Sequence, residues 1–243
     1  MIPLTVPHLG GNELKYVTDC IQTGWVSSAG AYVTQFEKMV AEFSGQPYGV
    51  AIVNGTSGLH LALHMLGVGA GDAVIIPNIT FIASANSAVY TGAEPIFIDI
   101  DPETWQMDLD LLQNFLENQT LQQDGKCLIK DTGNHLKVIM PVHVLGNMCD
   151  MEKLMTLADH HNIEVIEDST EALGSYCNGK HAGSWGVMSV FSFNGNKIIS
   201  TGGGGVLVTR DKDHASRAKH LSTQSKVDPE SYYHDEIGFN YRL

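Results

Sequence analysis

The sequence predicts an α/β protein built around one mainly parallel, seven-stranded sheet. Short apolar runs alternate with helical segments along the 243-residue chain, and this alternation is typical of parallel strands joined by helices. Most runs lack the period-2 pattern of a half-exposed strand, so we expect both faces of the sheet to be covered. We place the strands at residues 50–53, 73–76, 96–100, 138–144, 163–166, 187–193 and 205–209.

Two helices are expected before the first strand, over residues 11–23 and 32–44. The second has apolar residues at helical spacing, namely Val33, Phe36, Val40 and Phe43. Residues 118–136 are polar and are predicted to form a surface loop inside the domain. No internal repeat or linker interrupts the chain, so we expect residues 1–243 to form an N-terminal segment and one large domain.

The composition excludes several classes of partner. The formal net charge is −13, and the resulting field repels nucleic acids and anionic membranes. No apolar run reaches the roughly 18 residues of a membrane span, and the N-terminal residues lack the features of a signal peptide. The four cysteines are widely spaced, so we expect free thiols in a cytoplasmic protein with no nucleic-acid or membrane partner.

The most informative feature is the surroundings of Lys197. This lysine ends the run S-F-N-G-N-K at residues 192–197, and glycines follow at 202–205. Upstream, an apolar strand ends in Glu167 and Asp168. A lysine can form a Schiff base with an aldehyde cofactor, a carboxylate can hold a pyridinium nitrogen, and Ser192 can help to hold a phosphate. A lone lysine is ordinarily a solvated surface residue, so the assignment to pyridoxal 5′-phosphate (PLP) depends on this combination.

A second candidate lies directly after the first predicted strand. The run Asn54-Gly55-Thr56-Ser57-Gly58 opens an apolar helix. Free backbone N–H groups and two hydroxyls at a helix N-terminus can bind an anion such as a phosphate. The alternative is a simple helix cap provided by Thr56 or Ser57.

Two further residues have a structural and a functional interpretation. Phe81 lies just past the second strand and could stack on a planar ring, or it could belong to the core. Asp168 ends the fifth strand, where ligands of open α/β sheets bind, or it could cap a following helix.

Two patterns are rejected as sites. Residues 174–180 have the G-x-x-x-x-G-K spacing of a P-loop, but His181 follows where Ser or Thr is required. We expect a hairpin turn there instead. The pair His160-His161 sits near a helix end; adjacent residues point in different directions, so we expect a solvated helix end and no metal site.

In this order, the phosphate loop, the aromatic residue, the aspartate and the S-F-x-x-x-K run with its glycines match a known family. The chain resembles the PLP-dependent sugar-nucleotide aminotransferases of the DegT type, within the fold-type I superfamily. The resemblance extends from Gly24-Trp25-Val26 to residues 238–242. It implies a three-layer sandwich as the large domain. It also implies a small C-terminal domain beyond Leu243, which this chain would lack.

The resemblance assigns roles around the cofactor ring. Lys197 would be the Schiff-base lysine, Asp168 the partner of the pyridine nitrogen, and Phe81 the residue that stacks on the ring. Glu171 would lie near the phenolic oxygen, where many relatives have Gln or His.

The resemblance also assigns the phosphate ligands and an assembly. Thr56, Ser57 and Ser192 would bind the phosphate, and Asn240 would reach the phosphate held by a neighbouring subunit. This implies a homodimer with shared active sites. A C-terminal stretch rich in apolar side chains is consistent with burial in such an interface; it includes Tyr232, Tyr233, Ile237, Phe239 and Tyr241.

The function implied is conversion of a nucleotide-linked 4-keto-6-deoxy sugar to its 4-amino sugar, with glutamate as the amino donor. The motifs look most like the subgroup that acts on UDP-linked 2-acetamido-4-keto-6-deoxyhexoses. Two alternatives remain. One is a PLP-dependent sugar dehydratase, in which a histidine replaces the lysine. The other is a truncated or non-catalytic relative that still binds PLP.

Overall fold

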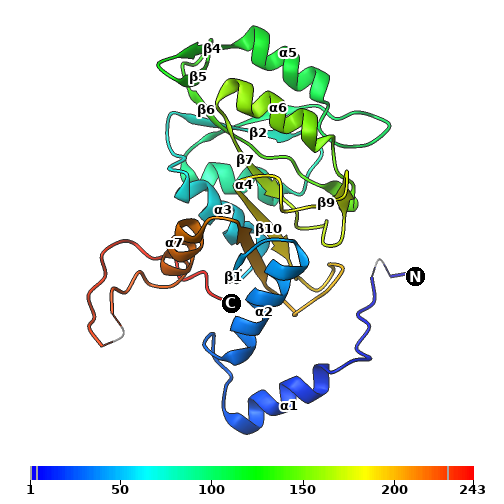
Figure 1. Cartoon of the computed structure of the whole chain (residues 1–243), viewed down its shortest axis with the longest axis vertical. Helices are drawn as coiled ribbons and strands as arrows, with labels where there is room; N and C mark the ends of the chain where they lie inside the picture. The colour runs from blue at the N-terminus through cyan, green and yellow to red at the C-terminus, as the bar shows by residue number, and fades with distance from the viewer. Residues whose placement is uncertain (1, 4, 229) are drawn as a thin grey trace.

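A computed structural model describes residues 2–3, 5–228 and 230–243, and it confirms the α/β fold (Figure 1). Seven strands form the central sheet in the order β1-β11-β10-β7-β6-β2-β3. Among these seven, only β11 runs antiparallel to its neighbours. Their bounds are β1 Tyr48–Ile52, β2 Asp72–Pro77, β3 Glu94–Ile98, β6 His135–Ile139, β7 Glu164–Asp168, β10 Met188–Ser192 and β11 Gly205–Thr209.

Helices cover both faces of this sheet and so make three layers (Figure 1). Helices α3, α4 and α7 pack on one face. Helices α5 and α6 pack on the other face, where α2 covers β10 and β11. The bounds are α1 Glu13–Thr23, α2 Ala31–Phe43, α3 Gly55–Met65, α4 Ile82–Thr91, α5 Leu109–Gln119, α6 Met151–His161 and α7 Lys212–Ser222.

Strand β2 explains why the apolar runs lack alternation. Ala73 and Ile75 pack on the face covered by α5 and α6, whereas Val74 and Ile76 pack on the face covered by α3 and α4. All four side chains are fully buried. Burial of each larger side chain contributes about 1.5–3 kcal/mol, so apolar residues are favoured at consecutive positions.

Residues 118–136 do not form the expected loop. They contain a hairpin of β4 (Thr120–Gln123) and β5 (Lys126–Ile129). Strand β5 pairs antiparallel with the start of β6, where Leu128 lies opposite His135. The turn residues Asp124 and Gly125 both have positive φ angles, 51° and 75°, as a tight hairpin turn requires. The predicted hairpin after residue 174 is confirmed, with strands β8 (Tyr176–Cys177) and β9 (Lys180–His181).

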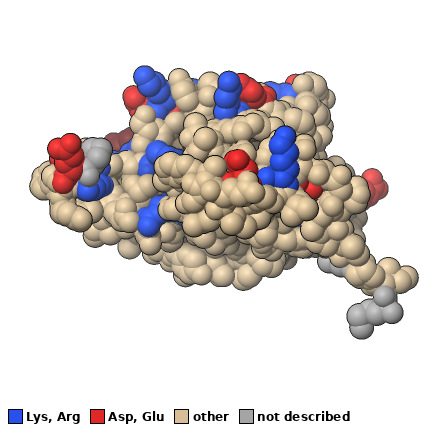
Figure 2. Space-filling view, turned by 90° about the horizontal axis from the view of Figure 1, so that it is seen from below, with Lys and Arg blue, Asp and Glu red and all other residues tan. Residues whose placement is uncertain are grey.

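The N-terminal arm, defined here as residues 10–30, contrasts with the sheet. Its helix α1 has no buried residue and lies away from the sheet (Figure 1). Several of its apolar side chains are largely exposed, including Leu14, Ile21, Trp25 and Val26. Figure 2, seen from the end that carries α1, shows few charged side chains over the lower part of this face.

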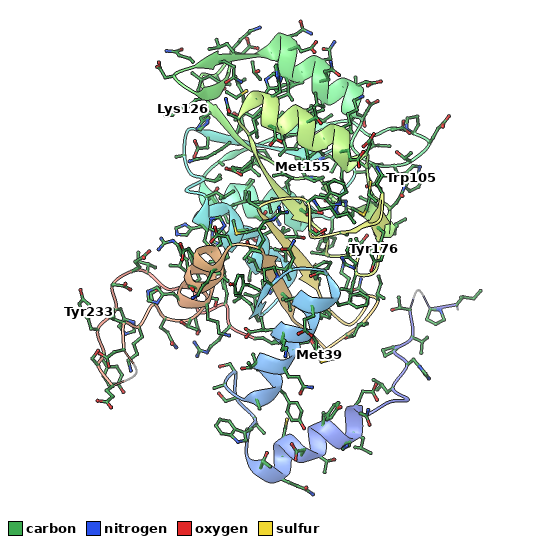
Figure 3. The ribbon with its side chains drawn as sticks, viewed as in Figure 1. Met39, Trp105, Lys126, Met155, Tyr176 and Tyr233 are labelled. Atoms are coloured by element: carbon green, nitrogen blue, oxygen red, sulfur yellow. The ribbon has the colours of Figure 1, made fainter. Side chains whose placement is uncertain are left out.

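The segment 224–240 after α7 also exposes apolar side chains, with Tyr232 and Ile237 largely in solvent. Figure 3 places Tyr233 well away from the sheet. None of the helices in the described part of the chain is long and apolar enough to cross a bilayer.

Candidate active site

Four parallel strands end at the same edge of the sheet and together form a pocket. Residues 54–56 follow β1, Phe81 follows β2, Asp168 ends β7 and Ser192 ends β10. The carboxyl ends of parallel strands are where open α/β sheets bind ligands. The resulting pocket has a volume of about 230 Å³ and is lined by Asn54, Gly55, Thr56, Phe81, Ala83, Asp168, Thr170, Glu171, Ser192, Asn194, Asn196 and Lys197.

The N-terminus of α3 forms one wall of the pocket. The side-chain oxygen of Asn54 accepts a hydrogen bond from Ser57 N at 2.8 Å, so Asn54 is the cap, and the prediction that Thr56 or Ser57 caps the helix is wrong. A Cβ at Gly55 would lie 2.9 Å from the Thr170 methyl carbon, so the close approach favours glycine. The helix N-terminus and the Thr56 hydroxyl can therefore face an anion.

Asp168 is 3% exposed, and both carboxylate oxygens are anchored. Oδ2 accepts from Ser84 Oγ at 2.6 Å, and Oδ1 accepts from Thr170 N at 3.1 Å. A turn, not a helix, follows Asp168, so the interpretation of Asp168 as the cap of a following helix is wrong. These contacts fix the position of a carboxylate at the pocket. Sequence reasoning missed Ser84, although it lies one helical turn after Phe81.

Phe81 precedes α4 at the mouth of the pocket and is 70% exposed. The alternative that it belongs to the core is therefore wrong. An aromatic face at this position is available to a planar ring that enters the pocket.

Lys197 lies in the loop between β10 and β11 and points into the pocket rather than into bulk solvent. Its Nζ atom lies 3.2 Å from Glu171 Oε1, and the two side chains are 14% and 32% exposed. The other Glu171 oxygen accepts a hydrogen bond from Leu145 N at 2.8 Å. The pocket thus holds one amine with an oriented carboxylate partner, a contact that spacing alone did not reveal.

Two predicted cofactor residues do not line the pocket. Ser57 uses its backbone N–H to complete the Asn54 cap. The side-chain oxygen of Asn240 accepts a hydrogen bond from Arg242, and Asn240 has a φ of 58°. The role of Asn240 at a neighbouring subunit's phosphate stays a prediction.

The helix-end histidines differ partly from expectation. His161 ends α6, as predicted, but it is buried rather than solvated. Burial, reinforced by the neighbouring His160, lowers the pKa of His161.

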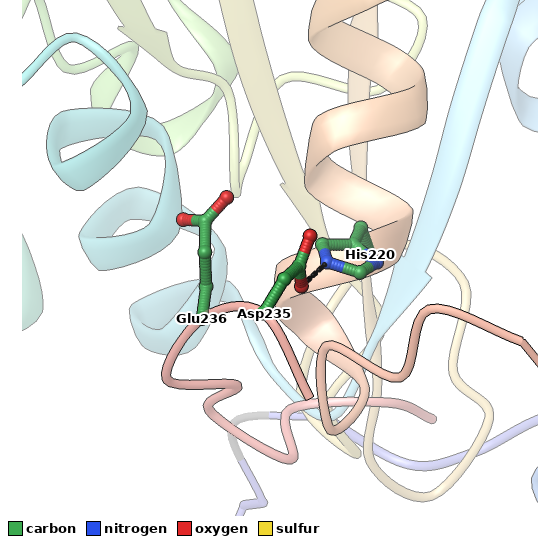
Figure 4. Close-up of side chains that lie close together, drawn as sticks. All are labelled: His220, Asp235 and Glu236. Atoms are coloured by element: carbon green, nitrogen blue, oxygen red, sulfur yellow. Dashed lines mark hydrogen bonds and ion pairs between the residues drawn. The ribbon is translucent and has the colours of Figure 1, made fainter. Parts of the chain in front are cut away.

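One cluster outside the pocket has metal-ligand chemistry. His220, Asp235 and Glu236 place ligand atoms within 4.8 Å of one another (Figure 4). However, the guanidinium of Arg217 binds both Glu236 oxygens, at 2.7 and 2.9 Å, and His220 Nε2 lies 2.7 Å from Asp235 Oδ1. Because a neighbouring guanidinium opposes a cation, we assign these contacts to holding the C-terminal segment against α7.

The donor set of the pocket fits PLP. A helix N-terminus with the hydroxyls of Thr56 and Ser192 suits a phosphate. The anchored carboxylate of Asp168 suits a protonated ring nitrogen, and the amine of Lys197 suits an aldehyde carbon. The fold and this pocket define an α/β domain of the aminotransferase type.

Comparison with known protein families identifies the family within this class of aminotransferases. The model of the DegT/DnrJ/EryC1/StrS aminotransferase family matches residues 7–243. The chain belongs to this family, as the resemblance implied.

Curated relatives include two proteins named GDP-perosamine synthase. The one from Escherichia coli O157:H7 is 44% identical over 242 residues, which cover 100% of this chain and 62% of the relative. The one from Caulobacter vibrioides is 42% identical, with 100% and 61% covered. The chain therefore spans about three fifths of the length of these relatives.

Solved structures share the fold. An aminotransferase from Psychrobacter cryohalolentis is 32% identical with a TM-score of 0.84, covering 99% of this chain and 60% of that one. The PLP-form of Spr1654 from Streptococcus pneumoniae is 27% identical with a TM-score of 0.84, covering 98% and 62%.

Proposed function

We propose that this chain provides the cofactor site of a PLP-dependent sugar aminotransferase. The observation that supports this most directly is the convergence of Lys197, Asp168 and the N-terminus of α3 on one pocket. Family membership and the names of the relatives support the same reaction class.

In this proposal, bound PLP supplies an electron sink for the bond-breaking step. Thr56, Ser192 and the α3 N-terminus bind the phosphate, and Phe81 covers the ring. Asp168 keeps the ring nitrogen protonated, because a carboxylate of opposite charge favours that form. The amine of Lys197, once free and neutral, would take up the α-proton of the amino donor in the first half-reaction, and in the second it would deliver a proton to the sugar carbon that gains the amine.

The substrate we propose is a nucleotide-linked 4-keto-6-deoxy sugar, with glutamate as the amino donor and the 4-amino sugar as the product. The relatives named for a GDP-linked sugar support a nucleotide sugar. They do not favour the UDP-linked acetamido subgroup that the motifs first indicated. A relative named UDP-N-acetyl-3-dehydro-alpha-D-glucosamine 3-aminotransferase is 36% identical over 208 residues, so the position of the keto group also needs a test.

The substrate test uses glutamate and a panel of GDP- and UDP-linked 4-keto sugars, with the UDP-linked 3-keto sugar as a comparison. Formation of a 4-amino product supports the proposal, and the preferred nucleotide identifies the subgroup. Exclusive conversion of the 3-keto sugar contradicts the assigned position. Loss of the hydroxyl without amine gain supports a dehydratase, which the presence of Lys197 argues against.

The cofactor test addresses Lys197 directly. PLP is added to the purified protein, the adduct is reduced with borohydride and the labelled peptide is identified by mass spectrometry. We expect the label on Lys197, and Lys197→Ala should show neither this label nor turnover. A label on another lysine, or none with PLP in excess, rejects the proposal.

We also propose a cytoplasmic homodimer with shared sites. The exposed apolar side chains of the N-terminal arm and of segment 224–240 support an interface. In a two-fold dimer each such contact is made twice, and Asn240 of one subunit would meet the phosphate at Thr56 and Ser192 of the other. Asn240→Ala should weaken PLP retention, and mixing with Lys197→Ala subunits should restore one complete site. Sedimentation as a stable monomer with full PLP occupancy contradicts this proposal.

A further inference from the structure

Behind the pocket lies a buried ionisable pair that the proposed reaction does not use. Glu167 precedes Asp168 in β7 and is fully buried. Its Oε2 atom lies 3.1 Å from Nε2 of His143, which is also fully buried. Removing two such groups from water is costly unless each is well hydrogen-bonded.

Glu167 meets that condition. Its carboxylate accepts backbone hydrogen bonds from Gly183 at 2.8 Å, Trp185 at 2.7 Å and Gly186 at 2.9 Å. Burial alone raises the pKa of Glu167, but the hydrogen bonds from His143 and these N–H groups outweigh it, so the pKa is lowered overall. Because a carboxylate only accepts, His143 must carry its hydrogen on Nε2. His143 Nδ1 has no hydrogen-bond partner among the described residues.

The pair fixes the start of a short segment that reaches the pocket. His143 N donates to Asp168 O at 3.1 Å, and the turn η1 (Val144–Gly146) follows at once. Within it, Leu145 adopts φ 55° and ψ 22°, a left-handed conformation that is unfavourable for leucine. The Leu145 side chain is largely exposed, so its packing does not account for this conformation.

The hydrogen bond that the Leu145 N–H donates accounts better for this left-handed conformation. It donates to Glu171 Oε2 at 2.8 Å, while Glu171 Oε1 lies 3.2 Å from Lys197 Nζ. The charged groups lining the pocket are Asp168, Glu171 and Lys197, and Lys197 forms an ion pair with Glu171. The orientation of Glu171 therefore decides where the amine is held.

We propose that His143 and Glu167 are positioning residues, which hold the 143–146 turn so that Leu145 N–H orients Glu171 against Lys197. This inference depends on the proposed function only for the identity of Lys197 as the reacting amine. The experiment measures the amine itself, without substrate.

The full 243-residue chain is freed of PLP and treated with a limiting amine-reactive reagent. The labelling rate of Lys197 is measured by mass spectrometry relative to Lys38, whose side chain is 73% exposed. His143→Leu should raise this rate by about twofold to fivefold, the change expected when a partly exposed ion pair is lost. His143→Gln, which keeps a side-chain donor, should restore a rate close to that of the wild type.

The control is His161→Leu, which also replaces a buried histidine by leucine but lies at the end of α6. It should lower the stability and leave the Lys197 labelling rate unchanged. If His143→Leu folds and labels Lys197 at the wild-type rate, the proposal is overturned.

A double-mutant cycle separates positioning from general loosening. Glu171→Gln should raise labelling at least as much as His143→Leu, and the double variant should not exceed Glu171→Gln alone. If the two effects multiply, His143 acts independently of Glu171 and the proposal fails.

A third measurement does not require His143→Leu to fold. The Leu145 amide should exchange slowly with deuterium in the wild type and faster in Glu171→Ala, which removes the acceptor of its hydrogen bond. Equal exchange in both proteins would show that Glu171 does not hold the Leu145 amide, and would overturn the proposal. Absence of PLP fixation at Lys197 would reject the proposed function but would leave each of these three outcomes measurable.

Discussion

The core of the sheet domain buries leucine side chains, whereas the N-terminal arm exposes one to solvent. Leu61 of α3 is fully buried, whereas Leu14 of α1 is 80% exposed. The buried acid Glu167 likewise finds all its partners within its own chain. The sheet domain is thus specified by its own sequence, while the arm presents apolar surface that a second copy can cover.

The largest stability effect should follow from a change in the sheet domain. Leu61→Ala should lower the free energy of unfolding by about 2–5 kcal/mol, because it removes buried methyl groups and leaves a cavity. Urea denaturation followed by circular dichroism measures this change. A loss below about 1 kcal/mol would mean that the domain is looser than its burial indicates.

Asp168→Asn tests the anchored carboxylate of the pocket, which Ser84 and Thr170 hold in place. It should leave the fold largely intact and lower the rate of the half-reaction with glutamate by about 10²- to 10³-fold, because the ring nitrogen loses its ionic partner. Single-turnover absorbance measures the rate. A rate within a few-fold of the wild type would show that Asp168 only supports the local turn.

Acidification should weaken the sheet domain through Glu167. A carboxyl group whose pKa is lowered by folding stabilises the protein above its unfolded pKa of about 4.3, and this contribution disappears as the pH falls through the folded pKa. Because the pKa of Glu167 is lowered, the free energy of unfolding should decrease as the pH is lowered below about 4. Urea titrations between pH 3 and 7 measure the slope.

The control for that slope is Glu167→Gln. It should be less stable at pH 7, because an amide donor faces backbone N–H groups, and its stability should depend less on pH below about 4. An unchanged slope would assign the acid effect to other carboxyl groups.

The smallest effect should come from the arm. Leu14→Ala should change the unfolding free energy of an isolated chain by less than about 0.5 kcal/mol, as for other exposed positions. If the arm contacts a second copy, the same change should also raise the dissociation constant of the dimer. Sedimentation at several concentrations measures this, and equal dissociation constants would remove the arm from the interface.

The buried strands were predictable because burial on both faces of the sheet requires consecutive apolar residues, which are visible in the sequence. The apolar runs at residues 73–76 and 205–209 required burial on both faces, and the structure forms strands there. The hairpin at 120–129 was missed because its residues are mostly polar, although Asp124-Gly125 is a strong turn signal. Only β5 alternates between exposed and buried residues, and it is four residues long.

The site was predictable in its residues but not in their contacts. Lys197, Asp168 and Thr56 follow recognisable strand ends, whereas Ser84 and Leu145 bind through geometry that only the fold creates. A backbone N–H has no sequence signature, so the Leu145 contact could not be read from the residue type. The interpretation of Asp168 as a helix cap failed because a turn follows it instead of a helix.

The attachment of the Lys197 loop has a kinetic consequence. The loop leaves β10 and returns through β11, and its ends are tied by the pairing of Ser192 with Gly205 and by the hydrogen bond from Phe193 N to Gly204 O at 2.9 Å. If Lys197 carries the cofactor aldehyde, as we propose, its amine stays beside the pocket after displacement, because both ends of the loop are held. Its effective concentration there should then be far above that of a dissolved amine, so recapture of the bound aldehyde by Lys197 should outcompete capture by free amines in solution.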